Sequence, residues 1–129
     1  MTQLTAVIFE DDDLFCYLLP RIFTKNGIKV TSYTNPSLYF CSDPSVEFCP
    51  VETPCCDFLL TDQLMPEMTG IEFLNRTKQM GCKIPDCRKA IISSNWLDED
   101  LKTAKKLASL VFDKSDSLQF IVCWVETFK

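Results

Sequence analysis

Short apolar runs of strand length alternate along the chain with longer segments of helical period. The apolar runs are Leu4 to Phe9, Ile28 to Tyr33, Asp57 to Thr61, Lys89 to Ile92 and Leu110 to Phe112. A strand that is repeatedly followed by a helix predicts a parallel sheet, because parallel strands need long crossover connections. Right-handed crossovers then place helices on both faces. The predicted fold class is therefore α/β, with a doubly wound five-stranded parallel sheet.

The segments between these runs predict the helices. In the first of them, Leu14, Phe15, Leu18, Leu19, Ile22 and Phe23 recur at spacings of three and four, which predicts an apolar stripe. Gly27 is placed to cap this helix, and Pro20 predicts either a kink or a later helix start. The other helices are expected from Asn35 through Phe40, from before Ile71 towards Gly81, from Asp98 to Ser109 and from Asp116 to Phe128.

Composition narrows the function classes. A chain of 129 residues predicts a single domain over 1–129, although it leaves open whether the chain is part of a longer protein. The net charge of −5 argues against binding to nucleic acid, and the absence of a long apolar run or signal sequence predicts a cytoplasmic protein without membrane contact. Histidine is absent, which excludes Ser/His and Cys/His catalysis, histidine metal ligands and phosphohistidine chemistry by this chain.

Polar residues gather where the predicted strands end. They are Glu10 and Asp11, Asp62, Ser93 or Ser94, and Lys114. The carboxyl ends of parallel strands meet at one sheet edge, so these side chains are expected to converge. Converging carboxylates repel one another and favour a bound cation, and oxygen ligands without His or Cys suit Mg²⁺. Because Mg²⁺ sites commonly include a substrate phosphate, the same edge is expected to receive a phosphoryl group, with Lys114 as its positive partner.

The motifs VIFEDDDLF, LLTDQLMPEMTG, IISSN and FDKS occur in this order over nearly the whole chain. In this the sequence resembles the receiver domains of two-component response regulators, including chemotaxis-regulator-like ones. The resemblance implies the flavodoxin-like strand order 2-1-3-4-5. It also implies that Asp62 is the phosphoacceptor, that Glu10, Asp11, Asp62 and the backbone carbonyl of Leu64 hold Mg²⁺, and that Lys114 contacts the phosphoryl group. Either Ser93 or Ser94 supplies the switch hydroxyl, and the spacing of 21 residues to Lys114 favours Ser93.

By the same resemblance, the chain takes phosphate from a sensor histidine kinase or a phosphotransfer protein. It then signals through the face formed by its last two helices and its last strand, towards a protein target that the sequence does not identify. It is not otherwise an enzyme, apart from its own phosphotransfer and dephosphorylation. Two positions depart from the family pattern: Ser115 replaces a common proline, which permits a trans peptide bond, and Val111 replaces the aromatic residue of the switch.

Two rival functions remain open at this stage. The segment VIFEDDD also looks like the start of haloacid-dehalogenase-type phosphatases, but Glu10 then occupies the nucleophile position, or the frame moves to Asp11 and Asp13. The other rival is a receiver-like docking module that is not phosphorylated, which the residues Val111 and Ser115 keep open. Steady hydrolysis of a phosphate ester would indicate the phosphatase, and no response to a phosphodonor would indicate the docking module.

Eight cysteines are unusual for a chain of this size, and four of them lie in a predicted surface loop at about residues 41–56. The loops before the third and fourth strands are expected to lie together at the sheet end opposite the phosphorylation site. Cys49, Cys55, Cys56, Cys82 and Cys87 are thereby brought into the same region. Zinc binding, reversible disulfides and simple packing are all compatible with this arrangement.

Overall fold

The computed structural model describes residues 3–35, 49 and 52–129. Within these residues, five parallel strands form one sheet in the order β2-β1-β3-β4-β5. The predicted fold class and strand order are confirmed. The helix expected from Asn35 through Phe40, and most of the cysteine-rich loop, lie outside the described residues.

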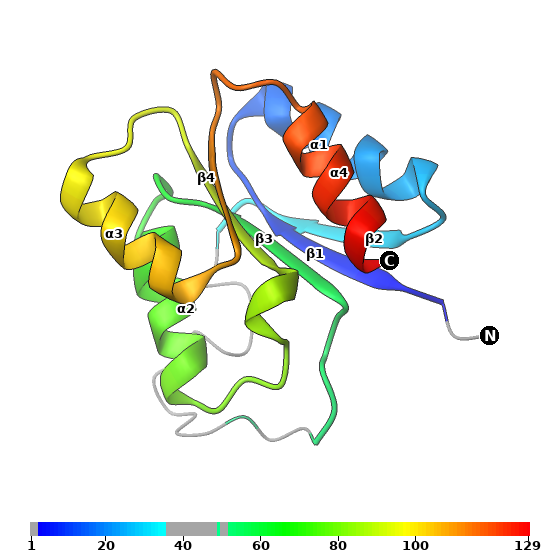
Figure 1. Ribbon diagram of the computed structural model, residues 1–129, viewed down its shortest axis with the longest axis horizontal. Coiled ribbons are helices and arrows are strands. Elements are labelled where there is room, and N and C mark those ends of the chain that lie inside the picture. Colours follow the sequence, from blue (N-terminus) through cyan, green and yellow to red (C-terminus); the bar gives the residue numbers. More distant parts are fainter. Residues whose placement is uncertain (1–2, 36–48, 50–51) are drawn as a thin grey trace.

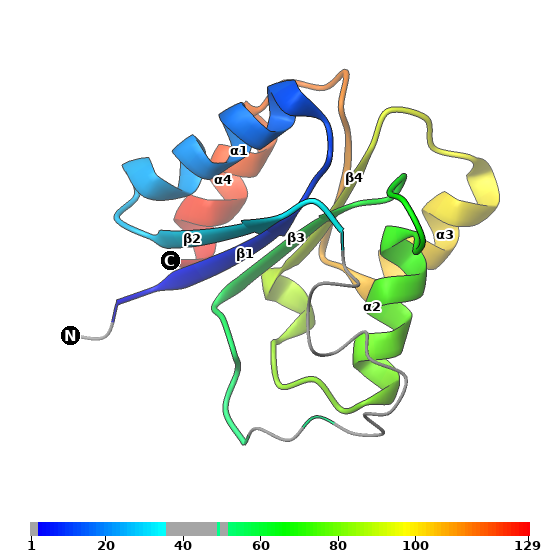
Figure 2. The ribbon, with the colours of Figure 1, turned by 180° about the vertical axis from the view of Figure 1, so that it is seen from behind.

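The strands are β1 (Thr5–Phe9), β2 (Lys29–Tyr33), β3 (Phe58–Asp62), β4 (Lys89–Ser93) and β5 (Leu110–Asp113). The helices are α1 (Asp13–Lys25), α2 (Gly70–Gln79), α3 (Asp98–Leu107) and α4 (Gln119–Phe128), with a short 3₁₀ turn, η3, at Asp86–Arg88. Helices α1 and α4 cover one face of the sheet, and α2 and α3 cover the other (Figures 1 and 2).

The central strands are buried on both faces. Every residue of β3 and of β4 is buried, whereas the edge strand β2 is half exposed. Successive side chains of a strand point to opposite faces, so each strand contributes to two cores. In β3, for example, Phe58 and Leu60 pack under α1 and α4, and Leu59 packs under α2 and α3. This explains why the strands read as nearly continuous apolar runs.

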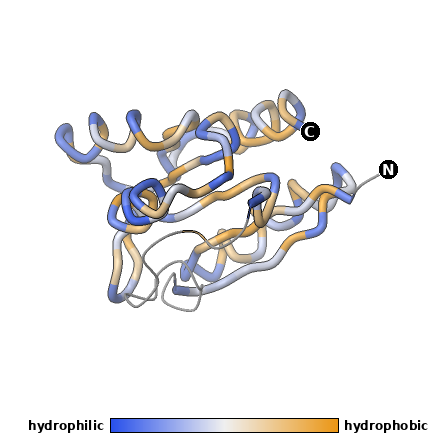
Figure 3. Tube along the Cα trace, turned by 90° about the horizontal axis from the view of Figure 1, so that it is seen from below, coloured by the Kyte–Doolittle hydropathy of each residue, from blue (hydrophilic) through white to orange (hydrophobic). Residues whose placement is uncertain are grey.

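Each helix buries one stripe of apolar residues and exposes its other side. Figure 3 shows the corresponding alternation of hydrophobic and hydrophilic residues along the trace. Under α1 and α4 the Phe58 ring contacts those of Phe23 and Trp124, with centroid distances of 5.7 and 5.3 Å. The edge-to-face geometry of these contacts is a favoured one for aromatic pairs. Three segments that are far apart in sequence are thereby joined in one core.

Helix α1 begins at Asp13, because the side chain of Asp12 accepts hydrogen bonds from the first turn. Pro20 lies inside this helix, so the expected alternative of a later helix start is wrong. Gly27 follows the helix with φ of 74° and allows the amide of Ile28 to bond the carbonyl of Phe23 at 3.0 Å, which confirms the predicted glycine cap. The predicted apolar stripe is wrong at Leu14, which is 60% exposed.

Two predicted helix boundaries are also wrong. The last helix begins at Gln119 rather than Asp116, because the carboxylate of Asp113 accepts hydrogen bonds from the amide and hydroxyl of Ser115 and holds the chain in a turn. Helix α3 ends at Leu107 rather than Ser109, whose amide instead bonds the carbonyl of Lys89 at 3.1 Å. In both places, local polar contacts outweigh helical periodicity.

Candidate functional site

The polar residues at the strand ends come together at the carboxyl edge of the sheet. Asp62 and Ser93 are the last residues of β3 and β4, while Glu10 and Lys114 directly follow β1 and β5. The parallel register pairs Ser93 with Asp113, and the amide of Lys114 then bonds the Ser93 carbonyl at 2.9 Å. The sheet itself therefore sets the spacing of these residues.

Lys114 is the centre of the site. Its Nζ donates hydrogen bonds to Asp62 Oδ2 at 2.9 Å and to Glu10 Oε1 at 3.1 Å. Only 10% of the lysine side chain is exposed, and both carboxylates are buried. The ring of Phe15 in α1 lies 4.8 Å from the ammonium and adds a cation–π contact. Although burial opposes the charge, the hydrogen bonds to Asp62 and Glu10 hold the pKa of Lys114 above its ordinary value.

Glu10 has more negative charge around it than one lysine neutralises. Its pKa is raised from 4.5 to about 7, mainly by burial and then by the neighbouring Asp62, although the backbone amide of Asp12 and the ammonium of Lys114 act in the opposite direction. Its Oε1 accepts hydrogen bonds from the amides of Asp11 and Asp12 as well as from Lys114. Its Oε2 is buried and has no hydrogen-bond partner within the described residues. This oxygen is free to bind a further positive group.

Asp11 completes a group of three carboxylates. One oxygen each of Glu10, Asp11 and Asp62 lies within 4.8 Å of the others, and Asp11 is exposed whereas the other two are buried. Three carboxylates on one side and open solvent on the other suit a cation that keeps several water ligands, as Mg²⁺ does. The unpartnered Oε2 of Glu10 supports the same fit. The residues present are therefore suitable ligands for Mg²⁺.

The segment after Asp62 is fixed by short contacts. The amide of Leu64 donates to Asp62 Oδ1 at 3.2 Å. The side-chain oxygen of Gln63 accepts from the amide of Ile71 at 2.8 Å, which ties the loop to the first turn of α2. Gly70 is required here, because a Cβ at this position would overlap the carbonyl oxygen of Asp62. The Asp62 carboxylate is thus held between the ammonium of Lys114 and the turn that leads into α2.

The two candidate switch serines lie in different environments. Ser93 is fully buried at the end of β4, whereas Ser94 is exposed in the bend that follows. The hydroxyl of Ser93 accepts a hydrogen bond from the amide of Asn95 at 3.2 Å. Ser93 is therefore the serine that lies at the same sheet edge as Asp62 and Lys114.

Three contributors to this site were not identified from the sequence: Gln63, Phe15 and Gly70. The glycine and the glutamine lie inside the motif LLTDQLMPEMTG, so the sequence marked their positions as part of a motif. Their structural role became clear only from the close approach between the loop and α2. Phe15 follows the helical period of the core residues in α1, and nothing in that pattern distinguishes a ring beside the lysine.

The raised pKa of Glu10 predicts a pH dependence of stability in magnesium-free buffer. Between pH 4.5 and about 7 the unfolded chain loses the Glu10 proton while the folded chain keeps it. The unfolded state binds fewer protons there, so the free energy of unfolding falls as pH rises through this window, by roughly 2 kcal/mol. The variant Glu10→Gln is expected to lack this fall. Urea denaturation at pH 5 and pH 8 measures the free energy of unfolding of both proteins. If it falls by the same amount in the wild type and in Glu10→Gln, Glu10 is not the group responsible.

Comparisons with known proteins agree with this architecture. No protein-family model matches the sequence, and no curated protein matches it. Several solved structures share the fold at low sequence identity. The receiver domain of the Francisella response regulator 1452 is 17% identical with a TM-score of 0.74, and the similarity covers 98% of this chain and 96% of that one.

Two further receiver domains, both described as CheY-like, give similar values. The protein from Methanospirillum hungatei JF-1 is 17% identical, with a TM-score of 0.74 over 98% of this chain and 93% of the other. The protein from Methylobacillus flagellatus is 12% identical, with a TM-score of 0.74 over 99% and 100% of the two chains. Among the described residues, no helix is long and apolar enough to cross a membrane. The chain therefore has the fold of the response regulator receiver domains.

Proposed function

We propose that residues 1–129 form a response regulator receiver domain that is phosphorylated on Asp62. The observation that carries this proposal is the buried ammonium of Lys114, which is bonded at once to Asp62 and to Glu10, with Asp11 beside them. An acceptor carboxylate beside a fixed positive charge is the arrangement that phosphoryl transfer requires, because that reaction depends on positioning and on charge stabilisation. The receiver fold supports the same function.

The phosphodonor is expected to be the phosphohistidine of a sensor histidine kinase or of a phosphotransfer protein, because this chain has no histidine of its own. A carboxylate oxygen of Asp62 attacks the phosphorus in line. The new O–P bond forms as the P–N bond of the donor breaks, and the leaving imidazole takes up a proton. Lys114 then bonds an oxygen of the transferred group, which offsets its added negative charge.

Glu10, Asp11 and Asp62 would hold Mg²⁺ at this site, and the receiver resemblance adds the backbone carbonyl of Leu64 as a further ligand. When bound, the ion supplies positive charge that reduces the repulsion between the carboxylates and the incoming phosphoryl oxygens. The chain itself positions the nucleophile: Lys114 bonds Asp62 Oδ2, and the Leu64 amide bonds Asp62 Oδ1.

The output surface is expected to be the face formed by α3, β5 and α4. Ser93 and Lys114 are adjacent through a backbone hydrogen bond, so a movement of either towards a phosphoryl group is transmitted to the end of β5. Leu97 and Phe120, which are 61% and 59% exposed, provide apolar contacts next to that strand end. The target is a protein rather than nucleic acid or a membrane, in agreement with the net charge of −5.

The test is incubation of the full chain with radiolabelled acetyl phosphate and Mg²⁺. We expect a stoichiometric label that survives acid, is lost in base as an acyl phosphate is, and does not form when EDTA removes the metal. The label should also decay slowly by self-dephosphorylation. A chain that takes up no label is a docking module with the receiver fold. Continuous hydrolysis of p-nitrophenyl phosphate without a stable label would instead identify a haloacid-dehalogenase-type phosphatase.

A further inference from the structure

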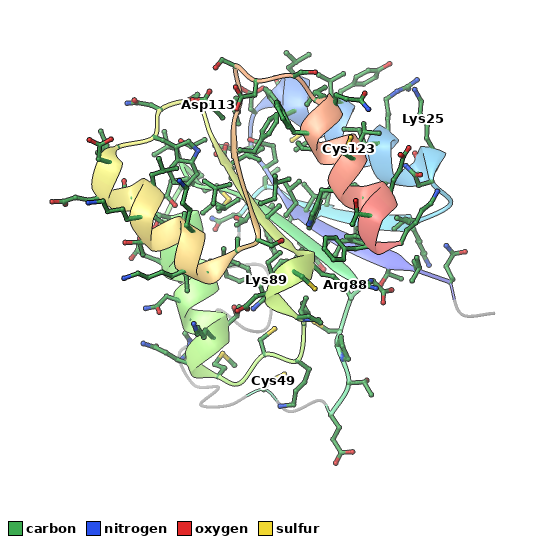
Figure 4. The ribbon with its side chains drawn as sticks, viewed as in Figure 1. Lys25, Cys49, Arg88, Lys89, Asp113 and Cys123 are labelled. Atoms are coloured by element: carbon green, nitrogen blue, oxygen red, sulfur yellow. The ribbon has the colours of Figure 1, made fainter. Side chains whose placement is uncertain are left out.

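A group of cysteines lies at the opposite end of the molecule from the acidic site. Figure 4 labels Asp113, at the carboxyl end of β5, and Cys49 at opposite ends, with further sulfur atoms near Cys49. Seven cysteines are described, and all are in the thiol form. The group of interest consists of Cys49, Cys55, Cys56 and Cys82, which we call the thiol cluster.

The backbone brings these cysteines together from two directions. The glycine cap at the end of α2 places Cys82 directly after the helix, with its amide bonded to the Thr77 carbonyl at 3.0 Å. The amide of Cys49 bonds the carbonyl of Met80 at 2.7 Å, at the same helix end. Cys55 and Cys56 arrive from the segment that leads into β3. Cys56 belongs to the same core cluster as Met80, and Cys82 packs against it, so the thiol cluster joins the end of α2 to the chain that precedes β3.

The side chains of the cluster interact. The thiols of Cys55 and Cys56 are within hydrogen-bond reach of each other, and this contact, followed by burial, raises the pKa of Cys56. Burial also raises the pKa of Cys82, whose thiol is close enough to Cys55 and Cys49 to be influenced by their charge. Without a cation, ionisation of one thiol therefore disfavours ionisation of the others. The same repulsion between like groups favours a cation at the acidic site.

Sulfur ligands select a different cation from the carboxylates. Thiolates are soft ligands that favour Zn²⁺, and four cysteines are a common structural zinc set, whereas Mg²⁺ prefers oxygen. A tetrahedral zinc site holds its sulfurs ~3.8 Å apart, given Zn–S bonds of about 2.3 Å. A disulfide between the neighbours Cys55 and Cys56 fits less well, since adjacent Cα atoms lie ~3.8 Å apart and disulfides usually need about 4.4 to 6.8 Å.

A positive charge near the cluster offsets part of the effect of burial on Cys82. Lys89 is 3% exposed, and its ammonium lowers the pKa of Cys82. Its ion pair with the exposed carboxylate of Asp86 is long, at 3.7 Å. A zinc ion with four thiolates keeps a net negative charge, which this buried ammonium offsets in part.

We propose that Cys49, Cys55, Cys56 and Cys82 bind one zinc ion, in a structural site separate from the acidic pocket. Among the described residues, only the carboxylate group already has three ligand atoms within 4.8 Å of one another, so zinc binding requires the cysteine side chains to rotate towards one another. Cys55 is exposed and Cys82 half-buried, which leaves room for this rotation. Cys87 is not counted among the ligands of this site; its backbone carbonyl accepts hydrogen bonds from Trp124 and Ser109. The ion fastens the chain before β3 to the end of α2.

The test is zinc content and affinity of the full chain, purified with a non-thiol reductant. We expect about one zinc per chain by mass spectrometry, and a higher melting temperature with Zn²⁺ than after chelation. Substitution of the exposed ligand, Cys55→Ser, is expected to weaken Zn²⁺ binding by about 100-fold in competition with a chromophoric chelator. Buried Cys56→Ser is expected to do the same, and circular dichroism checks that each variant folds.

The controls separate this site from the acidic one. Cys123→Ser, at an exposed position of α4, and Asp62→Asn are both expected to bind Zn²⁺ as the wild type does. A reduced wild-type chain that binds no zinc overturns the proposal. Loss of zinc binding in Asp62→Asn also overturns it, because the ion then belongs to the carboxylates. So does a result in which Cys55→Ser and Cys56→Ser bind Zn²⁺ as tightly as Cys123→Ser does.

Discussion

Replacement of Asp62 by asparagine is expected to abolish phosphorylation by acetyl phosphate completely. An amide is not a nucleophile towards phosphorus, and no other carboxylate of the described chain has the same position, bonded to Lys114 on one oxygen and to the Leu64 amide on the other. The measurement is incorporation of radiolabel in the presence of Mg²⁺. A loss of label identifies the acceptor only if the variant remains folded.

The structure indicates that Asp62→Asn does remain folded. Asp62 is the carboxylate that raises the pKa of Glu10, so its neutralisation reduces repulsion in the buried pocket, and Lys114 keeps its bond to Glu10. The matched control is Asp98→Asn, an exposed acid in the first turn of α3, which should be labelled as the wild type is. Equal labelling of Asp62→Asn and Asp98→Asn would mean that the phosphoryl group is accepted elsewhere.

Replacement of Lys114 by methionine is expected to lower the free energy of unfolding by about 3 kcal/mol at pH 8 in magnesium-free buffer. The change leaves Glu10 and Asp62 buried without the ammonium that bonds both in the wild type. A buried charge that loses its partner keeps the full cost of its desolvation, with no ion pair to offset it. Urea denaturation of both proteins measures the difference. The label from acetyl phosphate should also form much more slowly, because the phosphoryl oxygens lose their fixed positive partner.

The pH dependence distinguishes this cause from lost packing. Below about pH 7 Glu10 is protonated in the folded protein, so the cost of Lys114→Met is expected to shrink at pH 5. It should also shrink in the double variant with Glu10→Gln, which removes one of the two charges. The exposed Lys102→Met in α3 serves as the control and should change stability by no more than about 0.5 kcal/mol. A cost that is the same at pH 5 and pH 8 would indicate lost packing against Phe15 instead.

Much of the fold was predictable because it depends on neighbouring residues. The apolar runs gave all five strands of the described sheet, and the alternation with helices gave their parallel direction. Gly27 was identifiable as a helix cap because few other residues adopt positive φ easily. The boundaries that failed, at Asp116 and Ser109, are positions where a side chain or a strand offers the backbone another hydrogen-bond partner.

For the site, the sequence alone determined which residues stand at the strand ends: Glu10, Asp62 and Lys114 follow apolar runs, and that position is a local property. Only the tertiary structure decided that one ammonium bonds two carboxylates that are 104 and 52 positions away, and that Ser93 is buried whereas Ser94 is exposed. These contacts arise from the crossover connections and from the packing of helices on the sheet. The residue pattern within one segment does not specify which distant segment will lie beside it.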